Sequence, residues 1–374
     1  MRNKRLDVLR CVAVFLVLLN HADISSFFIR VGWVGVDLFF VLSGFLISGL
    51  LFSDHKKNKT IQWKRFLLRR GLKIYPAFYT FLLLIGLAAY LAFHFVAPLT
   101  AYLHEIFFVM NYEPRVWAHT WSLAVEEHFY FLLPIFLLGA VHFSSDRENP
   151  FRILPRAMAV IAVLCIGFRA ATVYIGKPDF EAAYMRTHMR MDSLFFGVLI
   201  GYFWHFRRSA LDRLMAPAKN CVFLAAISGA LLSSSYFWSR EGRFFATFGY
   251  SFLYLGFSGV LLLCLYVYGV LPAGISRVAG MVGGAMAHIG MYSYSIYLWH
   301  IPLSAWLAPL VRRVLHISTG PYEDFGIYFA GSIAIGILMS KLIEYPVLRM
   351  RDKLFPAPAS APVVGADDGS GIAR

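Results

Sequence analysis

Charged residues are scarce in this chain of 374 residues, where aspartate, glutamate, lysine and arginine together make up 15%. Hydrophobic residues make up 59% instead. A soluble domain of this length has no need of so much apolar surface. Apolar runs recur along the whole chain, and each is long enough to cross a lipid bilayer. The composition therefore argues against a soluble protein and predicts one that spans a membrane several times.

Cysteine is also rare. The chain has four cysteines, each alone inside an apolar run: Cys11, Cys165, Cys221 and Cys264. Their spacing fits neither a disulfide framework nor a metal site, so we interpret them as small apolar residues and expect no metal. Acidic residues are outnumbered, and the net charge is +14. A basic chain can indicate nucleic-acid binding, but these charges lie in loops between apolar runs, so we expect no nucleic-acid partner.

Ten apolar runs can be placed along the chain. They lie near residues 6–22, 32–52, 74–97, 122–141, 157–176, 191–206, 219–238, 246–270, 285–308 and 324–343. With the N-terminus in the cytoplasm, most lysines and arginines fall on the inner side, as the positive-inside rule requires. The predicted fold class is all-α, a polytopic membrane protein with about ten transmembrane helices and both termini cytoplasmic.

A single domain is expected. Residues 1–354 form the predicted transmembrane domain, and we find no internal repeat in them. Residues 355–374 are rich in alanine, proline, glycine and aspartate. Such a composition cannot bury enough apolar surface to fold, so we predict a disordered cytoplasmic tail.

The first run carries two ionisable residues, Arg10 and His21. A charge near the middle of a membrane helix costs about 2.5–3.5 kcal/mol, so such residues are functional candidates. Eleven positions of helix bring the two side chains to within about 20° of one direction and about 16 Å apart along the axis. They could be a snorkelling arginine and a polar helix end. Alternatively they form one stripe, with an anion-binding cation, Arg10, toward the cytoplasmic side and a titratable base, His21, near the outer end.

The second run contains Asp37, a carboxylate inside apolar sequence, followed by Ser43 and Gly44. Small residues such as these let membrane helices approach closely, and packing is the simpler interpretation for Ser43 and Gly44. The basic loop 53–73 follows, and part of its charge reflects the positive-inside rule alone.

Three cations open the next helix at the predicted membrane surface. They are Arg69, Arg70 and Lys73. Arg69 and Lys73 stand one turn apart on one helix face. We interpret the three as a phosphate clamp on the cytoplasmic side.

The fourth run begins with Trp121 and contains Glu126, Glu127 and Tyr130. The two carboxylates point about 100° apart, so one could face solvent and the other the interior. Either could meet His21 near the outer surface, fix the tautomer of the imidazole and raise its basicity. A solvated helix start that favours acidic residues explains one of them more easily than both.

Further polar residues fall inside or beside the later runs. The site-lining candidates are Asp37, Ser43, Trp121 and Tyr130 in the earlier runs, and Arg190, Asp192, Tyr294 and His300 in the later ones. His300 is more often expected as a satisfied buried histidine than as a catalyst. Near the end of the tenth run, pairing of Lys341 with Glu344 at i, i+3 is a sufficient structural interpretation.

Taken together in this order, these motifs resemble the acyltransferase-3 family of bacterial integral-membrane O-acyltransferases. The match runs from Arg5 to about Arg351. It is carried by Arg10 with His21, residues 35–44, Arg69-Arg70 leading to Tyr75-Pro76, residues 121–130, and Ser293-Tyr294 to His300. One departure is Lys73, where arginine is more usual, and lysine lacks the bidentate phosphate contacts of arginine.

The resemblance implies an enzyme of the bacterial inner membrane. It would move an acetyl group from cytoplasmic acetyl-CoA to a hydroxyl of a cell-surface carbohydrate, which could be lipid-linked. The Arg–His pair and the acidic pair of the family map onto Arg10, His21, Glu126 and Glu127. Some members of the family carry a second acyltransferase domain after the membrane bundle, where this chain has only the short predicted tail. It would therefore finish the transfer itself or hand over the acetyl group to glycan-assembly proteins.

Our hypothesis is that the phosphates of CoA bind Arg10, Arg69, Arg70 and Lys73. His21, oriented by Glu126 or Glu127, then deprotonates the acceptor hydroxyl, and we expect direct transfer rather than an acyl-enzyme. The rival class is a proton-coupled transporter of a glycan or small anion, in which the buried charges form a pathway. Transporters often show paired halves with interrupted helices, and the absence of a repeat favours the enzyme.

Overall fold

The computed structural model describes residues 3–22, 24–266, 273–316 and 318–356, which form helices and no strands. The helices are α1 (Lys4–Asn20), α2 (Ser26–Val31), α3 (Gly35–Asn58), α4 (Trp63–Phe93), α5 (Leu99–Ile106), α6 (Trp121–Phe143), α7 (Leu154–Tyr174), α8 (Phe180–Met185), α9 (Met191–Phe206), α10 (Arg208–Met215), α11 (Ala218–Phe237), α12 (Tyr250–Tyr266), α13 (Ala273–Gly290), α14 (Ser293–Leu315), α15 (Pro321–Met339) and α16 (Tyr345–Leu354). The predicted all-helical class is confirmed. The predicted disordered tail lies, from residue 357 onward, outside the described residues.

Seven helical segments of the described chain are long and apolar enough to cross a membrane. They are Ser26–Asn58, Trp63–Phe93, Trp121–Phe143, Pro150–Tyr174, Ala218–Phe237, Phe245–Tyr266 and Pro321–Leu354. The other three predicted runs correspond to α1, α9 and α14. The first two have 17 and 16 residues, and α14 carries Arg312 and Arg313 in its last turn. Multiple membrane spans are therefore supported, while the ten-helix count and the orientation stay predictions.

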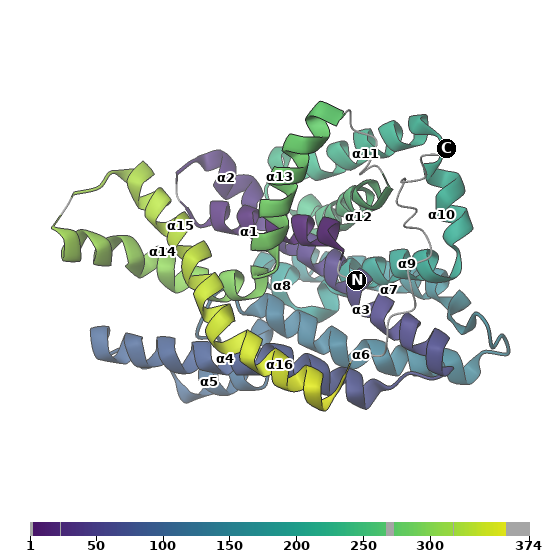
Figure 1. Cartoon of the computed structure of the whole chain (residues 1–374), viewed down its shortest axis with the longest axis horizontal. Helices are drawn as coiled ribbons and strands as arrows, with labels where there is room; N and C mark the ends of the chain where they lie inside the picture. Colours follow the sequence, from purple (N-terminus) through teal and green to yellow (C-terminus); the bar gives the residue numbers. More distant parts are fainter. Residues whose placement is uncertain (1–2, 23, 267–272, 317, 357–374) are drawn as a thin grey trace, which may run out of the picture.

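The ninth predicted run, 285–308, is not one helix. The chain turns at Met291 and Tyr292, which separate α13 from α14. The end of α13 packs closely on α1, because a Cβ at Gly290 would lie 1.8 Å from the backbone oxygen of Asp7. From there α14 leaves in a new direction and packs along α15 (Figure 1). Apolar composition runs through the turn, so hydropathy alone does not reveal it.

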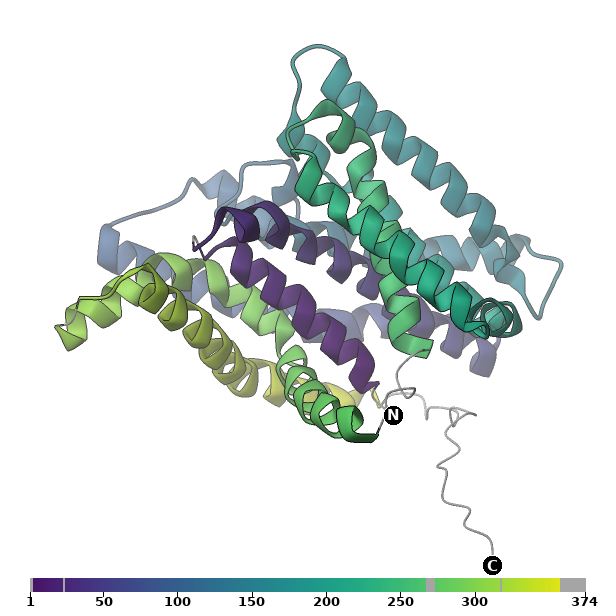
Figure 2. The same cartoon turned by 90° about the horizontal axis from the view of Figure 1, so that it is seen from above.

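The centre of the bundle is formed by α1 and α3, with α9 and α12 packed against α3 and α13 against α1 (Figures 1 and 2). The closest crossing joins α3 to α9 at Gly44 and Gly197. A Cβ on Gly44 would lie 1.9 Å from the oxygen of Leu194, and one on Gly197 would lie 2.3 Å from the oxygen of Val41. This confirms close helix packing at Gly44.

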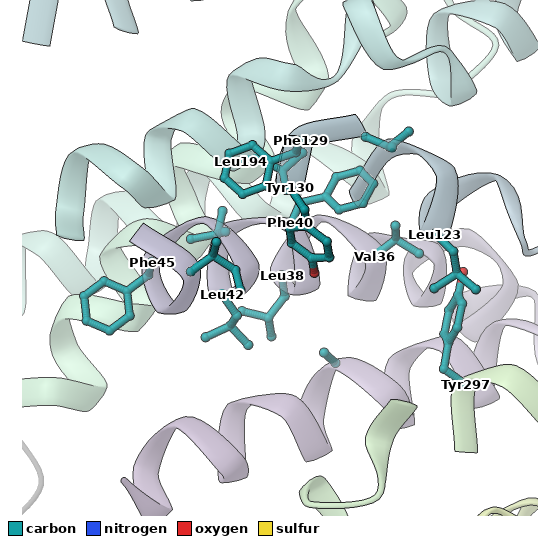
Figure 3. Packing of buried hydrophobic residues seen from close by; sticks show 14 of the residues in the cluster. Val36, Leu38, Phe40, Leu42, Phe45, Leu123, Phe129, Tyr130, Leu194 and Tyr297 are labelled. Atoms are coloured by element: carbon teal, nitrogen blue, oxygen red, sulfur yellow. The ribbon is translucent and has the colours of Figure 1, made fainter. Parts of the chain in front are cut away.

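The hydrophobic core follows α3, which buries side chains on more than one face. Val36, Leu38, Phe40 and Leu42 are all under 10% exposed. Figure 3 shows them between α6 and α9 on one side and α1 on the other. Because α3 is buried nearly all round, polar residues that it carries must find partners inside the protein.

Candidate active site

A cavity of about 100 Å³ lies between α1, α3, α4, α6 and α14. This volume holds several water molecules, or the reactive end of a substrate, but not a whole coenzyme. Eight of the residues predicted as site residues line it: Arg10, Ser43, Arg70, Lys73, Glu126, Glu127, Tyr130 and Tyr294. Five separate stretches of sequence are thereby brought to one place.

Both adjacent glutamates of α6 point into this cavity, so neither is the solvated helix start that we considered. Glu126 accepts hydrogen bonds from the Ser43 hydroxyl at 2.9 Å and the Tyr130 hydroxyl at 2.6 Å. Glu127 accepts one from the Tyr75 hydroxyl at 3.0 Å. Its other oxygen, Oε1, is buried and has no partner among the described residues.

The predicted pairing of His21 with one of these carboxylates is wrong in this structure. The Glu126 and Glu127 oxygens that are hydrogen-bonded are taken by hydroxyl groups of α3, α4 and α6, and His21 bonds elsewhere. Helical phase shows that two adjacent residues point apart, but not which neighbouring helix each one meets. The carboxylates face α3 and α4, whereas His21 stands at the far end of α1.

The cations of the cavity come from α1 and α4. Arg10 forms an ion pair with Asp7 at 3.0 Å. Arg70 stacks over the Tyr130 ring, 5.1 Å from its centroid. Lys73 lies one turn beyond Arg70 and interacts electrostatically with Glu344. Positive and negative groups therefore face each other across the cavity, which suits a substrate with charged and polar parts.

Arg69 does not share this cavity. Its guanidinium pairs with Asp352 of α16 at 3.0 Å and donates to the backbone oxygen of Phe355. We expected Lys73 to share a site with Arg69, but it shares the cavity with Arg70. The reason is that α16 packs along α4 (Figure 1), and its Asp352 binds the Arg69 guanidinium. Arg69 thus stands at the edge of the site, beside Arg351.

Glu344 is a cavity residue that sequence reasoning missed. It is 5% exposed and accepts a hydrogen bond from Ser295, whereas Lys341, its expected i, i+3 partner, points outward. The reason is a π-helical turn at Ser340–Glu344, which rotates Glu344 inward. Such turns often mark functional positions. No pattern in the sequence indicates that this turn of the helix contains an extra residue.

His21 caps the C-terminal end of α1, as its position in the first run predicted. Its Nδ1 lies 2.9 Å from the backbone oxygen of Val17, so Nδ1 carries the proton and Nε2 is left as the acceptor. The His21 ring meets the His300 ring edge to face, with centroids 5.0 Å apart. His300 in turn meets His119 at 5.1 Å. We call these three residues the histidine cluster.

Tyr297 and Ser122 connect the histidine cluster to the cavity. Both line the cavity, and their hydroxyl oxygens are 2.6 Å apart. The Tyr297 hydroxyl donates to the backbone oxygen of His119, and the Tyr297 ring lies 5.4 Å from the His300 ring. The cavity is therefore joined to His21 by the hydrogen bonds of Ser122 and Tyr297 and by the ring contacts of Tyr297 with His300 and of His300 with His21.

Three predicted site residues, Asp37, Arg190 and Asp192, form buried ion pairs and do not line the cavity. Asp37 pairs with Arg190, and Asp192 pairs with Arg169 at 2.9 Å. All four side chains are fully buried between α3, α7 and α9, away from the cavity. In each pair, the attraction between the opposite charges offsets the free-energy cost of burying them.

Trp121 does not line the cavity either. Its ring packs on Tyr184 and Phe40, with centroids 4.6 Å and 6.0 Å apart. The indole is 3% exposed. Trp121 thus anchors the start of α6 in the core, next to the cavity residue Ser122.

Glu105, at the end of α5, fixes the loop before α6. Its Oε1 accepts hydrogen bonds from the backbone nitrogens of Val116 and Trp117 and from the Thr120 hydroxyl, at 3.0, 3.2 and 2.9 Å. The side chain is fully buried, and burial raises the pKa of Glu105 to about 7 from its ordinary value of 4.5. Because this loop carries His119, Glu105 holds the histidine cluster in place.

This raised pKa predicts a pH-dependent stability. The folded protein holds the Glu105 proton more tightly than the unfolded chain, so the stabilisation is full below pH 4.5 and is lost as the pH rises through 7. Glu105→Gln cannot ionise and should gain stability over the wild type at pH 8, on the order of 1–3 kcal/mol. Unfolding midpoints in detergent at pH 5 and pH 8 measure this. The exposed Glu148→Gln is the control, and equal pH responses of all three proteins would contradict the assignment.

Metal ligation is not offered by these side chains. Within the ranges that the structure describes, no group of three or more histidine, cysteine, aspartate or glutamate residues has a geometry that could hold a metal ion. The three residues of the histidine cluster lie within those ranges, so this finding includes them.

Comparison with known proteins places this site in a family. A model described as an acyltransferase domain matches residues 3–341. The peptidoglycan O-acetyltransferase OatA of Listeria monocytogenes is 28% identical over 368 residues, which cover 91% of this chain and 55% of that protein. A putative peptidoglycan O-acetyltransferase of Bacillus subtilis, YrhL, is 25% identical over a match that covers 82% of this chain and 49% of YrhL.

A third relative is the O-acetyltransferase OatA of Staphylococcus aureus, 26% identical, with 80% of this chain and 50% of the relative covered. The chain thus spans about half the length of these curated relatives. No solved structure matches the chain.

Proposed function

The chain belongs to the acyltransferase-3 family, whose model spans residues 3–341, and from this premise we propose that it is a membrane O-acetyltransferase. It moves an acetyl group from cytoplasmic acetyl-CoA to a hydroxyl of a cell-surface or lipid-linked carbohydrate on the outer side of the bacterial inner membrane. One observation carries the proposal: the cavity that holds Arg10, Arg70 and Lys73 is joined, through hydroxyl groups and the His300 ring, to His21, whose acceptor nitrogen is free of the backbone. The relatives named as peptidoglycan O-acetyltransferases support a carbohydrate acceptor.

The donor enters from the side of α1 where the chain begins. Arg10, Arg70 and Lys73 attract the phosphates of CoA, and Arg69 stands with Arg351 at the edge. Phosphate is recognised by arginine through paired hydrogen bonds and by lysine as a point charge. The cavity holds only the reactive end of the donor, so the nucleotide stays at the mouth and the thioester points toward Tyr297.

The transfer needs one base and no covalent enzyme intermediate. His21 Nε2 takes the proton of the acceptor hydroxyl while its oxygen attacks the thioester carbon. The new C–O bond forms, the C–S bond breaks, and the proton passes from His21 to the departing thiolate of CoA. The hydrogen bond from Nδ1 to the Val17 carbonyl keeps His21 in the tautomer that this step requires.

Transfer of labelled acetyl from acetyl-CoA to soluble peptidoglycan fragments by the purified protein tests the proposed function. We expect acetyl esters on the glycan that mild base removes. Release of CoA without any acetylated product, or transport of a glycan without acetylation, would sink the proposal.

Removing the charge of Arg70 should weaken the binding of acetyl-CoA specifically. A charge-assisted hydrogen bond contributes about 1.5–3 kcal/mol, so Arg70→Ala should raise the KM for acetyl-CoA by about 10–100-fold with a smaller effect on the acceptor. Initial rates at varied acetyl-CoA measure this. Arg156→Ala is the matched control, because Arg156 is an exposed arginine outside the cavity. Similar KM values for both variants would place the donor elsewhere.

A further inference from the structure

The three imidazoles of the histidine cluster share one arrangement. Each has one ring nitrogen against a backbone carbonyl: His21 Nδ1 at Val17, His119 Nε2 at Leu298 and His300 Nδ1 at Tyr297. A nitrogen in that position must donate its hydrogen, which fixes the tautomer that each ring adopts when it is neutral. The second nitrogen of each ring is then an acceptor with its lone pair directed away from the backbone.

Two of these acceptors are buried without a partner. His300 Nε2 and His119 Nδ1 have no hydrogen bond among the described residues, and their side chains are 0% and 4% exposed. Unpartnered buried acceptors cost free energy and are rare in folded proteins. They lie behind His21, the exposed member of the cluster, which the proposed function makes the base.

The surroundings restrict what could satisfy them. The nearby hydroxyls of Tyr297 and Ser122 bond each other and the backbone oxygen of His119. The cluster therefore offers acceptors, and the hydroxyl hydrogens of Tyr297 and Ser122 are already engaged. The described residues do not form a metal site. A ligand that donates several hydrogen bonds without carrying a metal fits this pattern, and hydroxyl groups are such donors.

We propose that His300 and His119 form a subsite that binds a second hydroxyl of the acceptor while the first reacts at His21. This inference rests on the proposed function and specifies its acceptor as a polyol. A sugar presents several hydroxyls on one face and satisfies both the base and the subsite. A simple alcohol has one hydroxyl and satisfies only His21, so the subsite favours transfer to a polyol over transfer to a mono-alcohol.

Small alcohols isolate this second contact. Ethylene glycol and ethanol both offer one reacting hydroxyl, and only ethylene glycol offers another. The probe is acetyl transfer from labelled acetyl-CoA to each alcohol at equal concentration, by the purified full-length protein. Because a site that leaves a buried polar group unpaired discriminates against the ligand lacking its partner, we expect wild-type transfer to ethylene glycol to exceed that to ethanol by about tenfold or more.

Two substitutions at His300 separate hydrogen bonding from shape. His300→Phe keeps a ring and removes the acceptor, and should reduce the ratio of diol to mono-alcohol transfer to about one. His300→Gln can place its amide oxygen near the position of Nε2 and should retain a preference of several-fold. Acetyl-CoA affinity within about twofold of the wild type shows that each variant is folded.

The outcomes are distinguishable. A wild-type ratio near one, or an unchanged ratio in His300→Phe with intact donor affinity, overturns the subsite and leaves the proposed function standing. A wild-type protein that transfers acetyl to no hydroxyl compound overturns the proposed function and the subsite with it. A high wild-type ratio that falls in His300→Phe and survives in His300→Gln supports the assignment.

Discussion

Replacing His21 by alanine is expected to reduce acetyl transfer by about 10²–10⁴-fold, the usual contribution of a general base. The protein should still fold, because His21 lies at the end of α1, is exposed, and makes one backbone hydrogen bond and one ring contact. Initial rates with labelled acetyl-CoA and peptidoglycan fragments measure the loss. Donor affinity should stay within a few-fold, since the cations of the cavity are untouched.

His142→Ala is the matched control for this experiment. His142 is an exposed histidine in the last turn of α6 and does not line the cavity. It should retain full activity. If His21→Ala transferred acetyl as fast as His142→Ala, another group would have to remove the acceptor proton, and the role assigned to His21 would be abandoned.

The second large effect is expected on stability. Asp37 and Arg190 form an ion pair in which both side chains are fully buried. Removing one partner leaves an uncompensated charge in the core, which costs about 3–5 kcal/mol. Asp37→Ala should therefore lower the unfolding midpoint in detergent by many degrees, or leave little folded protein in the membrane.

An exposed pair supplies the control. Arg312 and Asp324 are 2.8 Å apart, with side chains 38% and 30% exposed. Such a pair contributes about 0–1 kcal/mol, so Asp324→Ala should change the midpoint little. Asp37→Leu combined with Arg190→Met should recover part of the lost stability, because apolar side chains of similar size can replace a buried pair. Equal midpoints for Asp37→Ala and Asp324→Ala would show that the buried pair is not structural.

Sequence reasoning succeeded where a residue's chemistry is set by its own helix. Arg10, His21, Glu126 and Glu127 are ionisable residues in apolar runs, and the cost of such placement singled them out as candidates. The position of His21 in the first run also predicted its place at the end of α1, and Arg10 of the same helix lines the cavity. These conclusions need only periodicity and the energetics of charge in a membrane.

It failed where the answer depends on a neighbouring helix. Asp37 and Arg190 are 153 positions apart, and nothing local shows that they pair with each other instead of a ligand. The same limit hid the contact of Arg69 with α16 and the hydroxyl partners of Glu126 and Glu127.

Local departures from regular structure were equally invisible. Glu344 reaches the cavity through a π-helical turn, and His119 joins the cluster from a loop held by Glu105. An extra residue in a turn shifts a side chain to a new face without changing composition or hydropathy. His119 stands two residues before Trp121, and its closeness to the Trp121-Ser122 motif would have justified including it as a candidate.

In the proposed function, acetyl enters at the cavity that holds Arg10, Arg70 and Lys73 on one side of the membrane and leaves at His21 on the other. Sealed vesicles with the cytoplasmic face outward test it most directly, with peptidoglycan fragments enclosed and membrane-impermeant labelled acetyl-CoA added outside. The account predicts acetylated fragments inside the vesicles, and none when His21→Ala replaces the wild type. Acetylation only of fragments added on the same side as the acetyl-CoA would contradict it.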